Sequence, residues 1–411
     1  MNDLQEKNAE EIVIVKRKSN FSFFVGIAIG MMIMAALTGA HGFYARQRFG
    51  EIDPTTKVRE IYTILDRYSM FEFEIEDLLN SMYRGLISGL GDNNAQYLNA
   101  RSFAEFNRRI GGVFVGIGVQ IVIDPEDQKA TVVTVFRGAP ANEAGIMVGD
   151  KIVYVDGVSA VGLALQEIVN MIGGREHTRV DVTIFRPYED VYIEKPIYRR
   201  RVEIPSVHHE VHEYRGEQIG YIQITTFDSV TYGQFNNALK SLTALGVSGI
   251  VIDLRNNSGG LLSSVTRITN MLIPEGIITY TKNTAGNRVN YYSNETYLGI
   301  PLVVLVNNVS ASASEILSGA VRDSGAGTII GERTFGKGTV QQTFELTDQS
   351  AIVITVRKFY TPSGELIEGV GITPQIYVEM YDELSRRVGS LSIEEDVQLA
   401  AALQAIIDKL D

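Results

Sequence analysis

The chain has 411 residues, of which 45% are hydrophobic and 21% charged, with 39 Gly, 10 Pro and no Cys. At roughly 150 residues per domain, this length predicts two or three domains, and the apolar fraction is high enough for each to bury a core. A formal charge of -12 argues against nucleic-acid binding, because contact with phosphate needs a basic surface. The absence of cysteine excludes disulfides, thiolate metal sites and a Cys nucleophile, but leaves the compartment open.

One segment departs from this average composition. Residues 21–40 carry no charge, and a helix of that length spans ~30 Å of hydrocarbon. Because three basic residues at 16–18 precede it, the positive-inside rule predicts a cytoplasmic N-terminus at 1–20, a membrane anchor at 21–43 and an extracytoplasmic remainder. The alternative is a cleaved signal peptide, since the small residues at 38–40 suit a signal peptidase. A secretory hydrophobic region is usually only about 7–15 residues long, which favours the uncleaved anchor of a single-pass cell-membrane protein.

Residues 44–109 are predicted to form a helical arm. Apolar residues recur at helical spacing between positions 56 and 90, which predicts two helices, and Gly91 is a natural stop. Two partners suit the apolar stripe of these helices: the next domain, or a second copy of the chain in a homodimer. The sequence does not decide between them.

A domain of short strands and turns is predicted next, over 110–187. Its expected elements are strands at 113–123, 131–136, 151–155 and 179–186 and a helix at 165–172. Three prolines between 187 and 205 predict a domain junction in that stretch.

Residues 188–380 show an α/β pattern. Apolar strands at 219–224, 249–254, 302–306 and 351–359 alternate with helices near 231–245, 260–272 and 313–322. Continuous apolar runs such as 302–306 predict strands that are buried on both faces. A final helix at 393–410 is expected within a C-terminal helical segment, 381–411.

The turn Asn257–Gly260 looks like the nucleophile turn of chymotrypsin-type serine proteases. That chemistry needs a histidine base on a double β-barrel. His212 lies only 46 positions before Ser258, which is too few for the intervening barrel, and the flanking pattern is α/β. The better interpretation is a Gly-rich turn whose backbone N–H groups can approach a ligand closely.

Two further motifs are rejected on similar grounds. Residues 331–338 lack the Ser or Thr that follows the lysine of a phosphate-binding P-loop, and the chain continues from them as a strand. His208 and His212 have helical spacing, with His209 between them, but Pro205 favours an extended segment and no further ligand type is clearly placed. We therefore expect packed or solvated histidines there and no metal site.

Ser312 and Lys337 remain as candidates for chemistry. Ser312 follows a buried strand and opens a helix, where its simplest role is an N-cap that pairs with Glu315 in a capping box. The same place puts helix N–H dipoles beside an incoming oxyanion. A lysine can serve as the base for a serine nucleophile when burial lowers its pKa from about 10.4 toward neutrality. Lys337 stands between two glycines in an apolar neighbourhood, so both interpretations stay open at this point.

Longer motifs around these two residues resemble those of a known family. Residues 307–320 (NNVSASASEILSGA) and 334–341 (TFGKGTVQ) are similar to segments of the C-terminal processing, or tail-specific, serine peptidases. Further matches are 253–262 (DLRNNSGGLL), 360–364 (YTPSG) and 369–374 (GVGITP). The likeness runs from about 55 to 411, and the 25-residue spacing from Ser312 to Lys337 is the family's.

The resemblance implies roles for single residues. Ser312 would be the nucleophile, Lys337 the general base, and Gln341 the residue that holds the lysine amine. The backbone N–H groups of Gly260 and Ala313 would form the oxyanion hole. The resemblance implies no metal and no cofactor.

Residues 110–187 resemble the PDZ domain of the same family. The match to its carboxylate-binding loop consists of Val115, Gly116, Ile117, Gly118 and Val119. Such a loop presents backbone N–H groups to a chain-terminal carboxylate while the peptide adds as a strand. The resemblance implies that this domain delivers a substrate C-terminus to the protease and can gate it.

The sequence departs from the family pattern at three places. Ser258 replaces the usual Pro of the Gly-rich turn, and Gln375 replaces the usual Asp after the Gly-Ile motif. Many members carry a basic residue after the PDZ helix, where this chain has Gly173 and Gly174. Asp323 matches a position that matters in some members, and we expect a structural role for it.

These observations together predict a multidomain protein. Its parts are an N-terminal transmembrane helix, a helical arm, an α+β PDZ-like domain and an α/β protease core of the crotonase/ClpP-like type. The expected function is that of a membrane-anchored, extracytoplasmic serine endopeptidase that acts on proteins with exposed C-termini. The alternative is a membrane-tethered PDZ scaffold that binds tails without cutting them, with Ser312 acting only as a helix cap.

Overall fold

The computed structural model describes residues 54–294 and 298–410, and the chain divides between Leu79 and Asn80 into two compact units. The predicted cytoplasmic segment and membrane anchor, residues 1–43, lie outside the described residues. Within the described ranges, no helix combines the length and the apolar character needed to cross a bilayer.

The first unit holds α2 (Pro54–Tyr68) and the start of α3 (Ile75–Ser88), the two helices that the apolar spacing predicts. Tyr62 and Phe73 meet there edge to face. α2 buries none of its residues, and apolar side chains such as Ile61 are exposed along it. The predicted apolar stripe is therefore present on this helix.

The second unit begins within α3, at Asn80, and continues into α4 (Ala100–Gly111). Asn99 caps α4 by accepting a backbone hydrogen bond from its first turn, and Gly112 ends the helix in the left-handed conformation, with φ 63°. The end of α4 is fixed to the α/β core, because the Ser229 backbone N–H donates to the carbonyl of Ile110 (3.1 Å). α4 is thereby held next to the core, although it belongs to the predicted helical arm.

An antiparallel sheet follows α4, with the strand order β3-β4-β5-β7-β8 and β6 paired to β5. Its elements are β3 (Val119–Ile123), β4 (Ala130–Val135), α5 (Pro140–Glu143), β5 (Lys151–Val155), β6 (Val158–Ser159), α6 (Leu165–Ile172), β7 (Arg179–Arg186) and β8 (Val191–Tyr198). Alternate residues of the strands point into one core, where Ile152 and Val182 are fully buried against Ile168 of α6. The predicted α+β fold of this region is confirmed.

One expectation for this region is wrong. The single strand predicted over 113–123 is two strands, because Gly118 at φ 83° interrupts the extended chain and β2 (Val113–Gly116) pairs with β9 (Arg200–Glu203) instead. The junction predicted over 187–205 consists largely of β8 and β9. Pro196 fits into β8 because an edge strand needs no backbone N–H on its open side.

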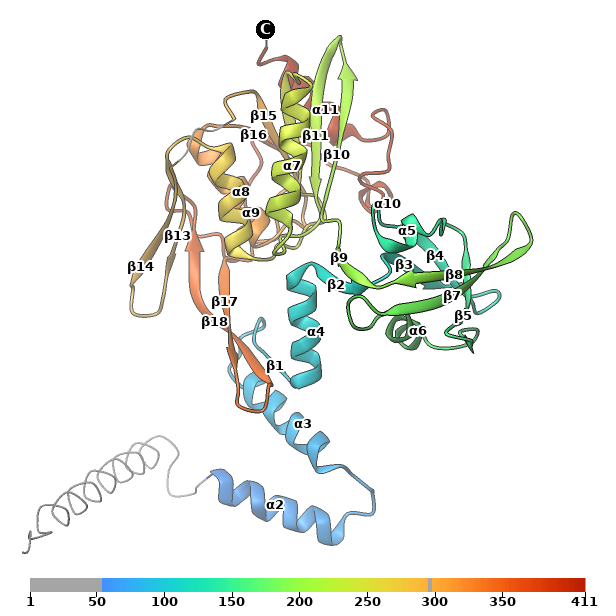
Figure 1. Cartoon of the computed structure of the whole chain (residues 1–411). Coiled ribbons are helices and arrows are strands. Elements are labelled where there is room, and N and C mark those ends of the chain that lie inside the picture. The colour runs from blue at the N-terminus through green and yellow to red at the C-terminus, as the bar shows by residue number, and fades with distance from the viewer. Residues whose placement is uncertain (1–53, 295–297, 411) are drawn as a thin grey trace, which may run out of the picture. The chain divides into compact units, whose positions relative to one another are not determined.

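The core is a six-stranded sheet in the order β10-β11-β12-β15-β16-β19, parallel except for the β10–β11 pair (Figure 1). Its elements are β10 (Val207–Tyr214), β11 (Glu217–Ile224), α7 (Thr231–Ala244), β12 (Gly249–Asp253), α8 (Leu262–Leu272), β15 (Leu302–Val306), α9 (Ala313–Ser324), β16 (Thr328–Gly331), β19 (Ile376–Tyr377), α10 (Asp382–Ser385) and α11 (Val397–Ile407). The predicted alternation of strands and helices is thus present.

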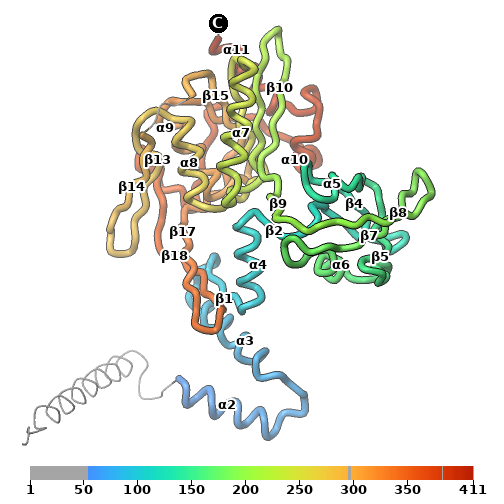
Figure 2. The backbone as a smooth tube through the Cα atoms, in the orientation of Figure 1, coloured from blue at the N-terminus to red at the C-terminus, as the bar shows by residue number. Residues whose placement is uncertain are grey.

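Helices cover both faces of this sheet. Figure 2 shows α7, α8 and α9 lying together, and their apolar side chains form one core with residues such as Ile252 and Val304. α11 covers the other face through Leu403, which packs with Val251 and Val303. β12 and β15 are buried at every residue, as their continuous apolar runs predict.

A second sheet lies beside α9 and carries the remaining strands. It consists of β1 (Gln96–Leu98), β13 (Gly276–Lys282), β14 (Arg288–Ser293), β17 (Thr339–Glu345) and β18 (Ala351–Tyr360), in the order β1-β18-β13-β14 with β17 also paired to β18. Phe359 of β18 is buried in the same core as α9. This sheet brings the start of β17, and with it Lys337, toward the start of α9.

Candidate active site

Two turns meet at the carboxyl edge of the core sheet. One follows β12 and contains Asn257–Gly260, and the other follows β15 and ends at Ser312. β12 and β15 are parallel neighbours, so the turns that follow them lie side by side. The Asn257 carbonyl joins them by accepting hydrogen bonds from the Ala311 N–H (3.0 Å) and the Ser314 hydroxyl (2.9 Å).

Ser312 has an unusual backbone conformation at the start of α9. Its φ of 56° and ψ of -110° lie in a region that a residue with a side chain rarely occupies, at a cost of about 1–3 kcal/mol. Its N–H donates to the Glu315 carboxylate (2.7 Å), and the Glu315 N–H donates to the Ser312 carbonyl rather than to the hydroxyl (3.0 Å). Within the described chain the Ser312 hydroxyl makes no cap hydrogen bond, so only the glutamate half of the predicted capping box forms.

The buried Glu315 carboxylate connects Ser312 to the loop that carries Lys337. Besides the Ser312 N–H, it accepts hydrogen bonds from the Thr334 hydroxyl (2.6 Å) and from the backbone N–H groups of Gly336 (2.7 Å) and Lys337 (2.9 Å). Burial raises the pKa of Glu315, and these four donors oppose that rise. One side chain thus fixes the backbone on both sides of the site.

Two backbone N–H groups remain unpaired beside Ser312. Among the described residues, neither the N–H of Gly260 nor that of Ala313 donates a hydrogen bond to another protein group. Ala313 is the first residue of α9, where helix N–H groups have no internal acceptor. Gly260 has φ 143°, and a Cβ there would lie 2.2 Å from the Phe227 carbonyl oxygen, so the turn requires glycine.

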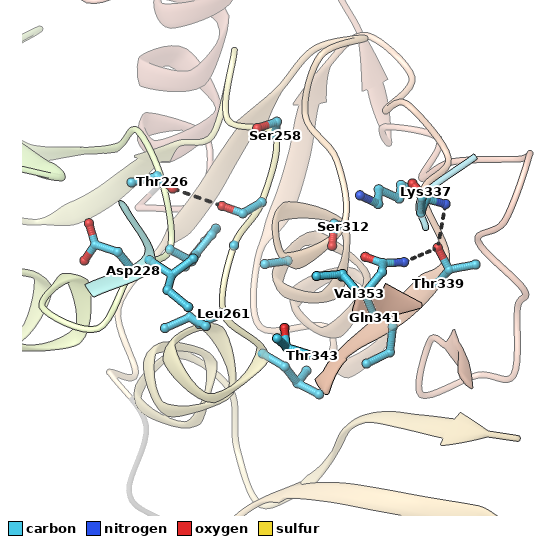
Figure 3. Close-up of a pocket in the computed structure, with 18 of the residues that line it drawn as sticks. Thr226, Asp228, Ser258, Leu261, Ser312, Lys337, Thr339, Gln341, Thr343 and Val353 are labelled. Atoms are coloured by element: carbon cyan, nitrogen blue, oxygen red, sulfur yellow. Dashed lines mark hydrogen bonds between the residues drawn. The ribbon is translucent and has the colours of Figure 1, made fainter. Parts of the chain in front are cut away.

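A cavity of about 530 Å³ contains the predicted catalytic residues (Figure 3). It is lined by Ser312, Lys337, Gln341, Gly260 and Ala313, together with Ser258 of the Gly-rich turn. In Figure 3, the Lys337 amine and the Gln341 carbonyl oxygen both point toward the side of the cavity that holds Ser312. The fold therefore brings together residues that are up to 81 positions apart in the sequence.

Gln341 has different hydrogen-bond partners from the one that the resemblance implies. Its amide nitrogen donates to the hydroxyls of Thr339 (2.9 Å) and Thr355 (3.4 Å). In the described part of the chain, no hydrogen bond joins Gln341 to the Lys337 amine, or that amine to the Ser312 hydroxyl. The amide orientation nevertheless leaves the carbonyl oxygen of Gln341 open toward the cavity.

The predicted carboxylate-binding loop lies between β2 and β3. Across the residues that the structure describes, the backbone N–H groups of Ile117 and Gly118 have no protein acceptor. β3 is an edge strand that pairs only with β4, and α6 packs beside it. A peptide could therefore add to the open edge of β3 while its terminal carboxylate meets the two N–H groups.

Comparison with known proteins identifies two parts of the chain. The PDZ domain model matches residues 106–184, and the model of peptidase family S41 matches residues 218–378. The chain is 34% identical over 323 residues to a carboxyl-terminal-processing protease of Synechocystis sp., a match that covers 78% of this chain and 75% of that protein. The chain belongs to peptidase family S41. This assignment confirms the predicted resemblance and the serine-type peptidase activity that it implies.

This S41 peptidase is also similar to a second curated relative and to a solved structure. A probable CtpA-like serine protease of Staphylococcus aureus is 31% identical over 388 residues, covering 92% of this chain and 76% of that protein. Among solved structures, the photosystem II D1 C-terminal processing protease is 31% identical and matches with a TM-score of 0.46, over 80% of this chain and 87% of that one.

Sequence analysis missed one wall of the S41 cavity. Phe106, Arg109 and Ile110 of α4 line it, as does Asn94 before β1. The only local signal is the strongly amphipathic character of α4, which does not say what its apolar face packs against.

Other residues considered in the sequence lie away from this cavity. The carboxylate of Asp323 accepts hydrogen bonds from Arg322 (2.9 Å) and from the Ser363 N–H (2.9 Å), which supports the expected structural role. His208 and His212 lie on strand β10, so the extended conformation predicted for them is confirmed. Residues 331–338 lead into β17 rather than a helix, as expected for a segment that is not a P-loop.

Proposed function

We propose that this S41 peptidase is a membrane-anchored, extracytoplasmic endopeptidase with a Ser312–Lys337 dyad that cleaves proteins recognised by their C-terminal tails. The observation that carries the proposal is the backbone conformation and hydrogen bonding of Ser312. Its backbone is strained, its hydroxyl does not cap α9, and it shares a cavity with Lys337 and two unpaired N–H groups. A serine that only capped the helix would use its hydroxyl to do so and would need no such conformation.

The chemistry that we propose is acyl transfer. The Ser312 hydroxyl attacks the scissile carbonyl carbon while Lys337 accepts its proton, and the carbonyl oxygen becomes an oxyanion between the N–H groups of Gly260 and Ala313. Lys337 then returns the proton to the leaving amine as the C–N bond breaks. Water hydrolyses the acyl-enzyme by the same route and frees Ser312.

The delivery of substrate is assigned to the PDZ loop at 115–119. The unpaired N–H groups of Ile117 and Gly118 support binding of a terminal carboxylate, and the relatives' names describe processing at carboxyl termini. Membrane attachment through residues 21–43 rests on the charge-free segment and the basic residues before it. Homodimerisation through the helical arm is supported by the exposed apolar side chains of α2, such as Ile61 and Ile64.

The dyad is tested with a reporter protein that carries an apolar C-terminal tail. Ser312→Ala and Lys337→Ala should each lower kcat by about 10³-fold or more, since residues of a catalytic unit act together. Ser258→Ala is the matched control, because Ser258 lines the same cavity but has no assigned role. Loss of cleavage in Ser258→Ala with full cleavage in Ser312→Ala would overturn the assignment.

Attachment and assembly are tested on the full chain. Fractionation of cells should place it in the membrane, and a variant that lacks residues 1–43 should be released. Ile64→Lys in detergent should lower the measured mass from dimer to monomer, whereas a monomeric parent would refute the homodimer.

A further inference from the structure

A short turn from the N-terminal side of the chain reaches the base side of the cavity. β1 pairs antiparallel with β18, with Gln96 opposite Val353, and this pairing places Asp92 beside Thr355. The Asp92 carboxylate accepts hydrogen bonds from the Thr355 N–H (2.9 Å), the Thr355 hydroxyl (3.1 Å) and the Asn94 N–H (3.0 Å). Burial alone would raise the pKa of Asp92, but the hydrogen bonds from Thr355 and Asn94 outweigh it and lower that pKa.

Asn94 makes the second connection from the same turn. Its side-chain nitrogen donates to the Thr339 hydroxyl (3.3 Å), which also accepts from the Gln341 amide nitrogen (2.9 Å). The Gln341 nitrogen has the Thr355 hydroxyl as its other acceptor (3.4 Å). The two threonines that accept from Gln341 are therefore both bonded to the turn 92–94: Thr355 to the Asp92 carboxylate, and Thr339 to the Asn94 amide.

The direction of these hydrogen bonds decides how the Gln341 amide faces. An ionised Asp92 can only accept, so the Thr355 hydroxyl proton must point to it. The oxygen of that hydroxyl is then left as an acceptor and requires the NH₂ group of Gln341. The two amide protons face the threonines, and the carbonyl oxygen consequently faces the cavity, where Figure 3 shows it pointing toward the side of Ser312.

We propose that Asp92 is a positioning residue for the catalytic base: through Thr355 it fixes the Gln341 amide with its oxygen toward the Lys337 amine. This inference rests on the proposed dyad. The Gln341 oxygen then accepts an N–H of Lys337 and keeps the amine aimed at Ser312 through the reaction. Asp92 touches neither the substrate nor the reacting atoms, and it acts only by setting hydrogen-bond polarity.

Asp92→Asn reverses that polarity without changing the size of the side chain. The Thr355 N–H (2.9 Å, to one carboxylate oxygen) and the Asn94 N–H (3.0 Å, to the other) then compete for the single carbonyl oxygen of the introduced amide. Where that oxygen accepts from the Thr355 N–H, the NH₂ group of the amide faces the Thr355 hydroxyl. The hydroxyl then accepts from this NH₂ group and turns its own proton toward Gln341. The Gln341 amide must rotate to offer its oxygen to Thr355, which leaves an NH₂ group, in place of an oxygen, facing the side-chain nitrogen of Lys337.

The test is a double-mutant cycle in the full chain, with Asp92→Asn, Gln341→Glu and both together. Asp92→Asn alone should lower kcat by about 30–100-fold with little change in KM, because misplacement of a catalytic group costs up to about 10²-fold. Gln341→Glu alone puts a carboxylate against a hydroxyl that can only accept, and should also be slow. In the double variant, Thr355 donates to the introduced carboxylate, whose other oxygen accepts from Lys337, so kcat should rise several-fold above Gln341→Glu alone.

Asp348→Asn is the matched control. Asp348 lies in the turn of the same β17–β18 hairpin and likewise accepts a backbone N–H (3.0 Å) and a hydroxyl (2.6 Å), both from Ser350. It does not line the cavity. Its variant should keep the parent kcat, and the melting temperatures of Asp92→Asn and Asp348→Asn should fall by similar amounts.

The outcomes separate this inference from the proposed function. If Ser312→Ala or Lys337→Ala cleaves like the parent, the dyad is wrong and the inference is overturned with it. If both are inactive but Asp92→Asn lowers kcat by the same factor in the parent and in the Gln341→Glu background, Asp92 acts independently of Gln341 and only the inference is overturned. The inference is supported if Asp92→Asn lowers kcat in the parent but raises kcat in the Gln341→Glu background. A general loss of stability would lower kcat in both.

Discussion

Considering the described residues alone, the PDZ loop and the protease cavity each present two unpaired backbone N–H groups next to a glycine with positive φ. In the PDZ domain the pair comes from consecutive residues, Ile117 and Gly118. In the protease core it comes from Gly260 and Ala313, which belong to different turns. The first pair is a local feature of one loop, whereas the second exists only when β12 and β15 lie side by side.

This difference matches the two kinds of charge that the pairs would meet. A substrate carboxylate arrives fully charged, so a loop that folds locally at the edge of a sheet is sufficient to bind it. An oxyanion exists only during the reaction and must be met by donors that are already in place. The core supplies this rigidity through Asn257, whose carbonyl accepts hydrogen bonds from Ala311 and Ser314 across the two turns.

The largest effect is expected for Gly260→Ala. The added Cβ would lie 2.2 Å from the Phe227 carbonyl, so the turn must shift and withdraw one oxyanion donor. We expect kcat to fall by about 10²–10³-fold with little change in the affinity for tails, measured by steady-state cleavage and by peptide titration. Gly233→Ala on α7 is the control, because nothing lies within 4 Å of a Cβ there. Equal losses of kcat and tail affinity would contradict the separation of the two sites.

A smaller effect is expected for Gly118→Ala, and it should appear in the affinity for tails instead of in kcat. A Cβ at Gly118 would lie 2.2 Å from the Cβ of Ala139, which displaces the loop and its N–H groups. Losing one hydrogen bond to a charged group should weaken tail binding by about 10–100-fold. Cleavage of a short peptide without a recognition tail should stay at the parent rate. If that peptide were cleaved as slowly as the tailed protein, the loop would have to affect the chemistry directly.

Asp323→Asn should leave both pairs of N–H groups unchanged and should alter only the stability of the fold. Burial alone would raise the pKa of Asp323, but hydrogen bonds from Ser363, Thr361 and Arg322 outweigh it and hold the pKa below its ordinary value of 3.8. A carboxylate with a lowered pKa stabilises the fold above its unfolded-state pKa, and this contribution is lost as the pH falls through the folded-state pKa.

The variant should therefore lower the free energy of unfolding by about 1–3 kcal/mol at pH 7, and by less below about pH 4. Urea denaturation at both pH values measures this difference. If the loss of unfolding free energy in the variant were larger at low pH than at pH 7, the pKa of Asp323 would not be lowered in the folded state.

Sequence patterns predicted what is local in this molecule. The apolar runs of β12 and β15, the helix that begins after Ser312 and the PDZ loop all have a signature within about ten residues, since burial and turn chemistry act over that range. The errors fall where tertiary pairing overrides local pattern. Residues 113–123 were predicted as one strand, yet β2 pairs with β9 and β3 pairs with β4.

The residues that support the cavity could not be predicted from the sequence for the same reason. Asp92 and Thr355 are 263 positions apart, and nothing around Asp92 indicates that its partner lies on β18. Glu315 was recognised only as half of a capping box, because its bonds to Thr334, Gly336 and Lys337 depend on how the two sheets pack. The motif predicted which residues are candidates for the chemistry but not which ones hold them in place.

Glu315 also couples the motions of the two halves of the cavity. Because one buried carboxylate accepts the N–H groups of both Ser312 and Lys337, shifting residues 334–337 alone leaves its Oε1 oxygen without a donor, and shifting Ser312 alone deprives the Ser312 N–H of this acceptor. The proposed nucleophile and base are therefore expected to be ordered together, so a half-assembled site, with one group in place and the other displaced, should be scarcely populated.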